Sequence, residues 1–400
     1  MATQSNTTST PPSDPACSTR PPRKGILFTA FEPSGDALAA PVIAELKHRS
    51  PETPIYAWGG PKMAAAGAEI IEETVHEAEM TAVSLGKIFE HIRINKQIST
   101  FIRARWIGAH VPVDSPAANF PICKITRRAG CRVAHLAAPQ IWAWARWRIA
   151  KLRRRTDRVL CLLPFEESYF NDRNVPAKFI GHPIFNTPFD EKLVETQVAS
   201  LPHGSPKIAF LPGSRLAEVR NNIRPMVRIF AELKGLNQDT AGVIVAANDQ
   251  VAAAIHQKVP DLPVGLFVVA ERLHAALKWA EIGILCSGTA TLDATRFRLP
   301  MAVLYRVNPL SWYLAGKWLI VSPYFALPNL IAGREVVPEF VPYFGGTSAV
   351  VKQVRQFIED SRLIAEQHDA LDRIAAFFEH VNPAMTAADE IQKLMNTSKK

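Results

Sequence analysis

The stretch "IAFLPGSRLAEVRNNI" (208–223) contains the unit on which the fold prediction rests. An apolar run ends at Leu211, a Pro-Gly turn follows, and a helix opens at Ser214 and Arg215. A continuous apolar strand that leads directly into a helix is typical of a parallel sheet covered on both faces. The free N–H groups at the helix start favour an anion, and Arg215 adds a forked donor suited to phosphate. A plain turn without a ligand is the alternative.

Short apolar, β-branched runs of the same kind recur along the chain, separated by segments with helical patterning. In the first half they are "GILFTA" (25–30), "PIYAWG" (54–59), "AHVPV" (109–113), "CRVAHLA" (131–137), "RVLCLL" (158–163) and "AKFIG" (177–181). In the second half they are "KIAFL" (207–211), "GVIVAA" (242–247), "LFVV" (266–269), "EIGILC" (281–286) and "PMAVLY" (300–305). This alternation predicts the α/β class with two doubly wound, Rossmann-like domains.

The domain boundary is expected where patterning is weakest, in a polar, proline-containing stretch. We predict a disordered tail at 1–24, a first domain at 25–188, a linker at 189–206, a second domain at 207–347 and C-terminal helices at 348–395. The tail is rich in Ser, Thr and Pro and lacks the apolar core of a secretory signal. The last segment keeps apolar residues at helical spacing: Leu371, Ile374, Ala375 and Phe378.

The net charge of the chain narrows the class of partner. A net charge of +9 favours an anionic partner, which could be nucleic acid, an acidic lipid surface or a phosphorylated small molecule.

The 5 cysteines include no C-x-x-C pair, so neither a disulfide framework nor a zinc site is expected. Cys131, Cys161 and Cys286 lie in or beside apolar runs and are predicted to be buried. This usage fits a reducing compartment.

No spanning helix is expected, because no uncharged apolar run reaches about 18 residues. The segment 310–332 comes closest, but Lys317 and two prolines interrupt it. Within it the aromatic residues Trp312, Tyr313, Trp318 and Phe325 suit a membrane interface. A buried pair of helices is the alternative.

In such sheets ligands bind beyond the carboxyl ends of the strands, so two loops of the first half are candidate sites. In "TAFEPSGDALAA" (29–40), a loop that admits a sugar or phosphate competes with a turn in which Ser34 or Asp36 caps the helix. In "VPVDSPAANF" (111–120), Asp114 follows an apolar strand. Its carboxylate could accept a proton from an attacking hydroxyl, or could bond only to the local backbone of an Asp-Ser-Pro turn.

Two further candidates lie in the second half. In "ILCSGTATLDATRFRLP" (284–300), hydroxyls and backbone N–H groups at a helix start suit a diphosphate, and Asp293 could reach a ribose hydroxyl. Together with the Arg215 loop this predicts a nucleotide-diphosphate site. In "PNLIAGREVVPEF" (328–340), Asn329, Arg334, Glu335 and Glu339 either contribute to that site or flank a helix end at Gly333.

Histidines and metal motifs give no separate site. His182 in "FIGHP" follows a strand, and a lone histidine in such a place is more often structural than catalytic. No H-E-x-x-H pattern or Asp/His cluster indicates a metal site, and no G-x-S-x-G elbow is present.

The basic stretch "QIWAWARWRIAKLRRR" (140–155) allows three interpretations: nucleic-acid binding, membrane contact or an ordinary helix with a solvated basic face. Its first part follows a strand, so Trp142 and Trp144 are expected to shape a pocket or the core. From about Ala145 a helix is expected, with Ile149 and Leu152 facing the sheet. Nucleic acid is the least favoured because no recognised module accompanies the charge.

These segments, in this order, resemble the lipid-A-disaccharide synthase family, which has the GT-B fold of two Rossmann-like domains facing a central cleft. The resemblance covers about 25 to 385. Its motifs are Ser34-Gly35-Asp36, "WGGPKMAAAG" (58–67), "VDSP" (113–116), "IWAW" (141–144), "LLPFE" (162–166), "GHP" (181–183), "LPGSR" (211–215), "SGTATLDA" (287–294) and "PNLIAGREVVPE" (328–339).

The resemblance implies an inverting transfer of 2,3-diacylglucosamine from its UDP derivative to 2,3-diacylglucosamine 1-phosphate, without a metal or cofactor. Asp114 matches the family's essential aspartate and is the expected base. The implied UDP-binding residues are Ser214, Arg215, Ser287, Gly288, Thr289, Thr291, Asp293, Asn329 and Glu335. The implied acceptor-side residues are Ser34, Gly35, Asp36, Trp142, Trp144 and His182.

Some acceptor-side positions depart from the family pattern. Phe31 stands where the family's first loop has glycine, and Ala118-Asn119-Phe120 replaces the usual Asp-Phe-Asn. A UDP-sugar-binding paralogue with another acceptor, or without catalysis, is therefore the alternative. The expected setting is cytoplasmic and peripheral on the inner membrane, with an anionic membrane surface and the acylated substrates as partners. A homodimer is compatible with the sequence, and nucleic acid is not expected to bind.

Overall fold

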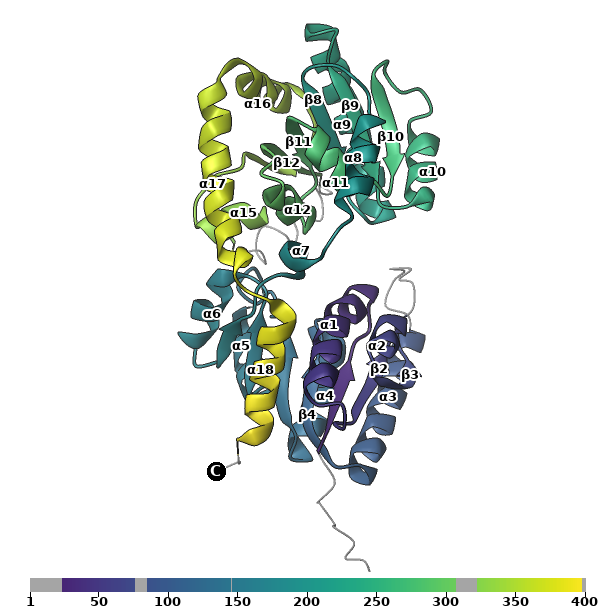
Figure 1. Cartoon of the computed structure of the whole chain (residues 1–400), viewed down its shortest axis with the longest axis vertical. Coiled ribbons are helices and arrows are strands. Elements are labelled where there is room, and N and C mark those ends of the chain that lie inside the picture. Colours follow the sequence, from purple (N-terminus) through teal and green to yellow (C-terminus); the bar gives the residue numbers. More distant parts are fainter. Residues whose placement is uncertain (1–23, 76–84, 145, 307–321, 398–400) are drawn as a thin grey trace, which may run out of the picture.

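Two parallel β-sheets organise the chain into two domains, which lie one above the other in Figure 1. The computed structural model describes residues 24–75, 85–144, 146–306 and 322–397. Helices flank both sheets (Figure 1), so the predicted α/β class with two doubly wound domains is confirmed.

The sheet of the first domain has the strand order β3-β2-β1-β4-β5-β6-β7. Its strands are β1 (Gly25–Thr29), β2 (Ile55–Gly59), β3 (Glu69–Glu73), β4 (Ile107–Pro112), β5 (Arg132–Leu136), β6 (Arg158–Cys161) and β7 (Ala177–Phe179). Every described pairing is parallel. The central strands are buried on both faces, which explains why they are continuous apolar runs.

The sheet of the second domain has the order β10-β9-β8-β11-β12-β13 and is also parallel. Its strands are β8 (Lys207–Leu211), β9 (Ala241–Ala246), β10 (Leu266–Ala270), β11 (Ile282–Leu285), β12 (Met301–Arg306) and β13 (Glu339–Tyr343). All the strands predicted from apolar runs are confirmed. The patterning missed β3 and β13, because both are partly exposed edge strands that carry glutamates, and Pro342 interrupts the second.

The helices that cover the sheets occupy the segments between the strands. In the first domain they are α1 (Pro33–Arg49), α2 (Pro61–Ala65), α3 (Leu85–Ala104), α4 (Pro116–Arg128), the 3-10 turn η1 (Arg146–Arg148), α5 (Ile149–Arg155), α6 (Pro164–Asn171) and α7 (Pro183–Asn186). The next helices are α8 (Glu191–Ala199), α9 (Leu216–Leu236), α10 (Asp249–Lys258), α11 (Leu273–Trp279), α12 (Ala290–Arg296) and α15 (Leu327–Ala332). The chain ends with α16 (Ser348–Glu359), α17 (Ser361–Glu379) and α18 (Pro383–Asn396).

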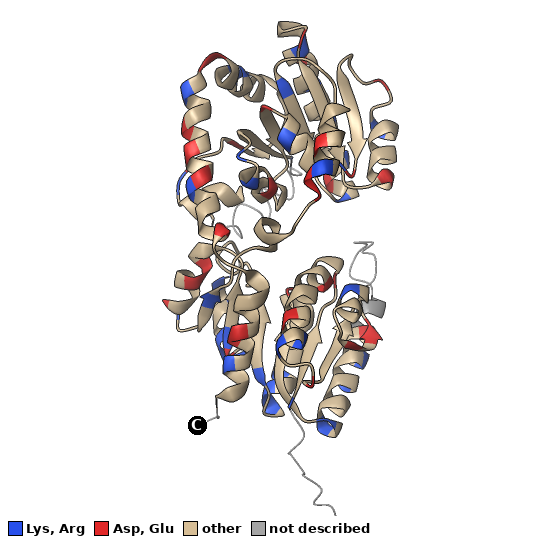
Figure 2. Ribbon diagram, viewed as in Figure 1, with Lys and Arg blue, Asp and Glu red and all other residues tan. Residues whose placement is uncertain are grey.

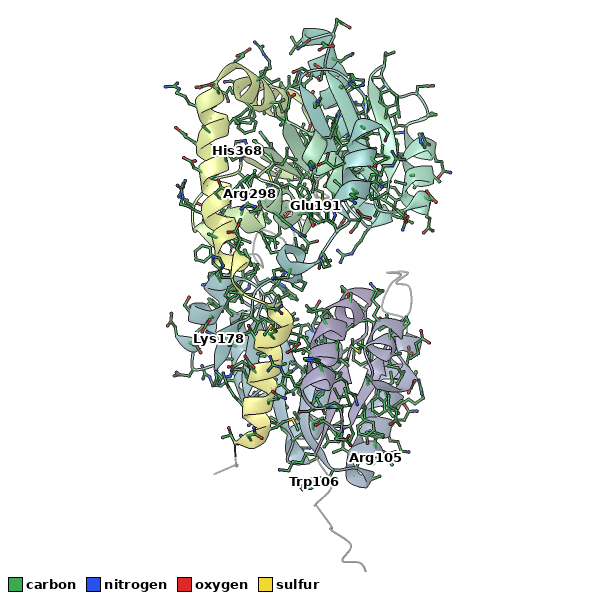
Figure 3. All side chains as sticks on the ribbon, viewed as in Figure 1. Arg105, Trp106, Lys178, Glu191, Arg298 and His368 are labelled. Carbon is green, nitrogen blue, oxygen red and sulfur yellow. The ribbon has the colours of Figure 1, made fainter. Side chains whose placement is uncertain are left out.

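The carboxyl ends of the first sheet's strands point toward the second domain. Trp106 directly precedes β4, and Figure 3 places Arg105 and Trp106 at the end of the first domain that lies away from the second. The loops that follow the strands therefore lie at the opposite end, between the domains. In each sheet the strand order reverses at one point, next to β1 and β4 in the first and next to β8 and β11 in the second. Ligands bind beside such switch points.

The segment 189–206, expected to be a linker, instead folds mostly onto the second domain. It contains α8, which begins after the N-cap residue Asp190 and packs against α11. Val194 and Leu201 are buried in the same core cluster as β9 and β11. Of the helix α8 itself only Val194 is buried, so its helical pattern was too weak to detect.

The C-terminal helices, expected as one unit, divide between the domains (Figure 1). The predicted inward residues of α17 are buried, and Arg298 bonds to Asp372 (2.8 Å) and Glu379 (2.5 Å) on that helix. Figure 3 shows Arg298 beside α17. By contrast, α18 packs on α1 and buries Ala388 and Ile391 in the core of the first domain.

Two other expectations concern the described part of the chain. None of its helices has the length and apolar character needed to cross a bilayer. The buried cysteines predicted from the sequence are confirmed, and Cys123 is buried as well. Trp312, Tyr313 and Trp318 lie outside the described residues, as do residues 1–23 of the tail. Both signs of charge occur on both domains in Figure 2.

Candidate functional site

A cavity of about 940 Å³ lies between the domains, at the edge where the strands end. The first domain contributes the loop after β5, and the second contributes the carboxyl ends of β8 to β12 with the loops after them and parts of the segment 322–341. The polar and aromatic residues of its wall are Gln140, Trp142, Trp144, Ser214, Arg215, Glu218, Glu271, Ser287, Thr289, Asp293, Tyr305, Ser322, Tyr324 and Phe325. Eight residues expected to form the site are therefore on this wall: Trp142, Trp144, Ser214, Arg215, Ser287, Gly288, Thr289 and Asp293.

The loop after β8 presents a helix N-terminus and a guanidinium to the cavity. Gly213 has φ 123°, and a side chain there would approach the Cβ atom of Glu218 to 2.7 Å. Arg215 is the N-cap residue of α9, and 63% of its side chain is exposed. Its Nη1 donates to Glu218 Oε1 over 3.2 Å, which keeps the guanidinium beside the helix start. This arrangement suits an anionic oxygen placed between the helix N-terminus and Arg215.

Asn222 fixes this loop from behind. It is fully buried, and its amide donates to Pro212 O (3.0 Å) and to Cys286 Sγ (3.4 Å). Its carbonyl oxygen accepts from the backbone N–H of Arg306 over 3.0 Å. One side chain thus connects the ends of β8, β11 and β12, a role that no sequence motif indicated.

The loop after β11 provides a second polar wall. Ser287 Oγ donates to the carbonyl oxygen of Phe325 (2.9 Å), and Gly288 has φ 145° with open space where a side chain would stand. Thr289 and Asp293 also line the cavity. Burial raises the pKa of Asp293 to about 6, while the nearby Arg296 lowers it. A ligand oxygen can approach the backbone of Gly288 closely, because this residue has no Cβ atom to block it.

Three residues expected on the UDP side do not form the cavity wall. Thr291 is fully buried, and its hydroxyl donates to Gly288 O over 2.7 Å, so it stabilises the loop. Asn329 is also fully buried; its amide bonds to the backbone of Val336 and Val337 and to Glu339 Oε1. Glu335 is exposed outside the cavity. A contact of these residues with UDP stays a prediction, because residue type does not reveal which way a side chain points.

Asp114 lies at the end of β4, beside the switch point of the first sheet. Asp114 (φ 46°) and Ser115 (φ 36°) both adopt the left-handed backbone conformation. This is unfavourable for residues other than glycine and is concentrated at functional sites. The backbone N–H of Asp114 donates to Leu136 O over 2.9 Å, and Asn119 Nδ2 donates to Asp114 O over 2.9 Å. The turn is therefore held on both sides.

A buried polar network supports this turn from inside the domain. Thr29 Oγ1 donates to Asn119 Oδ1 over 2.6 Å and lies 2.9 Å from His110 Nε2. His110 Nδ1 lies 3.1 Å from Thr126 Oγ1. Burial lowers the pKa of His110 to about 3, so the ring is neutral. Asn119 belongs to the stretch that departs from the family pattern, yet it holds the Asp114 turn.

The charges around Asp114 come from both domains. Burial raises the pKa of its carboxyl above the ordinary value, and the Glu32 carboxylate raises it further. The backbone N–H of Ser115 and the Arg215 guanidinium lower it. Glu32 is fixed by a bond from Ser115 Oγ (2.9 Å). A carboxylate with a raised pKa is suited to accept a proton from an attacking hydroxyl, although Asp114 itself is not among the residues that line the cavity.

The Ser34-Gly35-Asp36 motif builds the first-domain loop. Ser34 is exposed in the first turn of α1, and Gly35 packs so closely that an added Cβ would lie 3.2 Å from Ala30. Asp36 is 2% exposed and accepts from the backbone N–H groups of Gly60 (3.2 Å) and Met63 (3.0 Å), among others. Asp36 therefore caps α2. One interpretation of the sequence was that Ser34 or Asp36 caps α1, but no side chain caps α1.

Trp142 reaches the cavity from a buried position, at 8% exposure. Its Nε1 donates to Glu166 Oε1 over 2.9 Å, and its ring packs edge-on against Phe165. Glu166 is 3% exposed and also accepts from the backbone N–H of Leu163 (3.1 Å). Burial raises the pKa of Glu166 to about 7, although the bond from Trp142 lowers it. The "LLPFE" motif thus fixes the indole at the site.

We expect Glu166 to make stability depend on pH. Its pKa is about 7 in the folded chain, against 4.5 ordinarily, so the folded state binds the extra proton between these values. The free energy of unfolding should therefore fall as pH rises from about 5 to 8, by at most about 3 kcal/mol. Urea unfolding across this range should show a smaller fall for Glu166→Gln than for wild type. The exposed Asp172→Asn serves as control, and an unchanged slope in Glu166→Gln would contradict the assignment.

Trp144 lies on the cavity wall and His182 does not, although both were expected on the acceptor side. Trp144 is 40% exposed and lines the cavity, and the Arg148 guanidinium carbon lies 4.1 Å from its ring centroid. His182 is not on the wall; it is the N-cap of α7, where Nδ1 accepts from Ile184 N over 3.3 Å. Burial lowers its pKa to about 4, so the ring stays neutral in this structural role.

Several residues of the cavity wall were not predicted from the sequence. Glu218 has a signal, because a carboxylate three residues after a helix N-cap is a capping pattern. Tyr305 and Glu271 come from strand ends without any motif. Among the described residues, no group of three or more His, Cys, Asp or Glu could hold a metal ion.

Comparisons with known proteins agree with this geometry. The family model "Lipid-A-disaccharide synthetase" matches residues 26–391. The lipid-A-disaccharide synthase of Cupriavidus pinatubonensis is 32% identical over 383 residues, covering 94% of this chain and 94% of that protein. A glycosyltransferase from Rickettsia africae superposes with a TM-score of 0.55 at 11% identity, over 94% and 100% of the two chains. S. aureus MnaA, solved with UDP, gives 0.57 at 12% identity, over 92% and 95%.

Proposed function

The chain belongs to the lipid-A-disaccharide synthase family, and from that premise we propose how its residues perform the transfer. The donor is UDP-2,3-diacylglucosamine and the acceptor is 2,3-diacylglucosamine 1-phosphate. The acceptor 6-hydroxyl attacks the anomeric carbon of the donor, the bond to the diphosphate breaks, and UDP leaves. The product is a β-1,6-linked disaccharide 1-phosphate.

Asp114 is the base in this proposal. Its carboxylate takes the proton of the 6-hydroxyl as the new glycosidic bond forms. The left-handed turn, held by Leu136 O and Asn119, keeps the carboxylate at the end of β4, beside the switch point. Burial and, to a smaller extent, the Glu32 carboxylate keep the pKa of the carboxyl raised, which makes it a stronger base once ionised.

The second domain holds the leaving UDP. Arg215 and the N-terminus of α9 contact the diphosphate, and the loop of Ser287, Gly288 and Thr289 encloses it from the other side. Asp293 accepts a hydrogen bond from the ribose. The additional negative charge that develops on the diphosphate as the bond breaks is then stabilised by a guanidinium and by helix N–H groups, so the transfer needs no metal.

The observation that carries the proposal is the position of Asp114 and Arg215, each just after a strand at the switch point of its sheet. The two residues come from different domains. A base on one side and a diphosphate-binding arginine on the other is the arrangement that an inverting displacement requires, because base and leaving group must lie on opposite sides of the anomeric carbon.

Both substrates carry acyl chains, so we further propose that the protein works at a membrane surface as a peripheral protein. Exposed apolar side chains support this: Phe89 (69% exposed) and Ile92 (59%) on α3, and Trp147 (69%) on η1. Helices that follow parallel strands begin at the carboxyl edge of the sheet, so the start of α3 lies on the side of the first domain that faces the second. Flotation with anionic vesicles should recover the protein, and Phe89→Ser with Trp147→Ser should reduce recovery; full recovery of this variant would contradict the contact.

A UDP-release assay tests the function itself. Purified protein should release UDP from UDP-2,3-diacylglucosamine when the acceptor is present, with a chelator of divalent cations in the buffer. Omitting the acceptor gives the control for hydrolysis. Binding of UDP measured by calorimetry, without release in the complete mixture, would refute the transfer while leaving UDP binding intact.

A further inference from the structure

A basic cluster lies next to the cavity on the first domain and is not used by the mechanism above. It consists of Arg148, Lys151 and Arg155, which come from η1 and α5. The Arg148 guanidinium carbon lies 4.1 Å from the ring centroid of Trp144. Lys151 Nζ and the Arg155 guanidinium carbon lie 5.3 Å and 5.7 Å from the ring centroid of Phe120. Two aromatic rings thus contact three cations: Trp144 contacts Arg148, and Phe120 of α4 contacts both cations of α5.

No acidic side chain of the described residues neutralises this cluster. None of the ion pairs there includes Arg148, Lys151 or Arg155. Partial burial lowers the pKa of Lys151, and the charges of Arg155 and Arg148 lower it further. Partial burial also lowers the pKa of Arg155. The cations therefore repel each other in the free protein, and a bound anion would offset this electrostatic repulsion.

The position of the cluster connects it to the acceptor side. Trp144 lines the cavity, so Arg148 stands at its rim. Phe120 directly follows Asn119 on α4, and Asn119 holds the carbonyl oxygen of Asp114. Lys151 and Arg155 thus pack on the helix α4 that also holds the turn of the base. The donor diphosphate, by contrast, has its cation and helix N-terminus on the second domain, at Arg215.

We propose that Arg148, Lys151 and Arg155 form a subsite for the phosphomonoester of the acceptor. This inference rests on the proposed function, because it assigns residues to one group of that reaction's acceptor. A phosphomonoester carries about −1.5 to −2 charges at neutral pH and offers several acceptor oxygens, which three converging cations match. The subsite would orient the sugar so that its 6-hydroxyl, at the other end of the ring, points to Asp114. It would also exclude acceptors without a phosphate.

The test compares two acceptors that differ only in the phosphate: 2,3-diacylglucosamine 1-phosphate and 2,3-diacylglucosamine. Calorimetry in neutral detergent micelles gives the Kd of each without any donor present. Wild type should bind the phosphorylated acceptor about 10- to 100-fold more tightly. Lys151→Gln with Arg155→Gln should remove most of that preference, leave the Kd for UDP unchanged, and raise the KM for the acceptor.

A matched control has the same change of charge on the same helix. Arg153→Gln with Arg154→Gln removes two cations whose guanidinium groups bond to the backbone carbonyls of Arg173 and Ala150. This control should keep the preference for the phosphorylated acceptor. Thermal unfolding of both double variants verifies that each is folded, and Lys151→Glu alone should weaken phosphorylated-acceptor binding as a second test.

Each outcome decides between the inference and its alternatives. Retention of the wild-type preference by Lys151→Gln/Arg155→Gln overturns the subsite. A defect that appears only on anionic vesicles, and not in neutral micelles, assigns the cluster to membrane phosphate and also overturns it. Loss of preference in a protein that shows no turnover supports the subsite and rejects the proposed function. Turnover with an unchanged preference rejects the subsite alone.

Discussion

Asp114→Asn is expected to lower kcat about 100- to 10,000-fold, because the amide cannot take the proton of the attacking hydroxyl. The substitution keeps the size and shape of the side chain, so the left-handed turn and its bonds to Leu136 and Asn119 should persist. The Kd for UDP should stay near the wild-type value, since the diphosphate is held by the other domain. Initial rates of UDP release and calorimetry with UDP separate the two effects.

The pH dependence of kcat/KM gives an independent readout of the same residue. The base must be ionised, so activity is lost as pH falls through the pKa of Asp114, which burial raises above the ordinary aspartate value. Glu32→Gln removes a neighbouring negative charge and should move this acid limb to lower pH. Full activity of Asp114→Asn, or an acid limb that Glu32→Gln leaves in place, would assign the base to another residue.

Arg215→Ala is expected to weaken UDP binding about 10- to 100-fold, which corresponds to about 1.5–3 kcal/mol for charge-assisted hydrogen bonds. The loss in kcat/KM should be larger than the loss in binding, because negative charge on the diphosphate increases as the glycosidic bond breaks. Arg215→Lys should recover only part of the affinity, since a single ammonium cannot form the forked contact. Calorimetry with UDP and steady-state rates check both values.

Arg220→Ala is the matched control for Arg215→Ala. Arg220 is exposed on the same helix, away from the cavity wall, so its loss changes the net charge equally. UDP affinity should be unchanged in this control. Arg215→Ala should also move the acid limb of the pH profile upward, because Arg215 lowers the pKa of Asp114. Equal UDP affinity of Arg215→Ala and wild type would contradict the placement of the diphosphate.

The sequence predicted the central strands, the α/β class and the family, and all three are confirmed. Buried parallel strands must be continuous apolar runs, so β1, β4, β8 and β11 were recognisable without tertiary information. Edge strands such as β3 are partly exposed, so they need not be continuous apolar runs. The return of α18 to the first domain was also hidden, because an amphipathic helix does not specify which of two cores its apolar face will cover.

The candidate site was predicted less completely than the fold. Glycine and hydroxyl residues after β8 and β11 were found because helix starts after parallel strands have a general chemistry. The direction of a side chain depends on tertiary packing, which is why Thr291 and Asn329 were expected on the wall but lie behind it. Asn222 and Glu166 were missed for the same reason. Their partners are distant in the sequence and come from other elements of the fold.

The central claim is that Asp114 and the Arg215 loop together perform an inverting transfer between two acylated sugars. Product analysis by NMR tests it most directly, using wild-type protein, UDP-2,3-diacylglucosamine, 2,3-diacylglucosamine 1-phosphate and a chelator of divalent cations. The account predicts UDP and a β-1,6-linked disaccharide 1-phosphate in equal amounts. An α-linked product, or UDP released without any disaccharide, would contradict it.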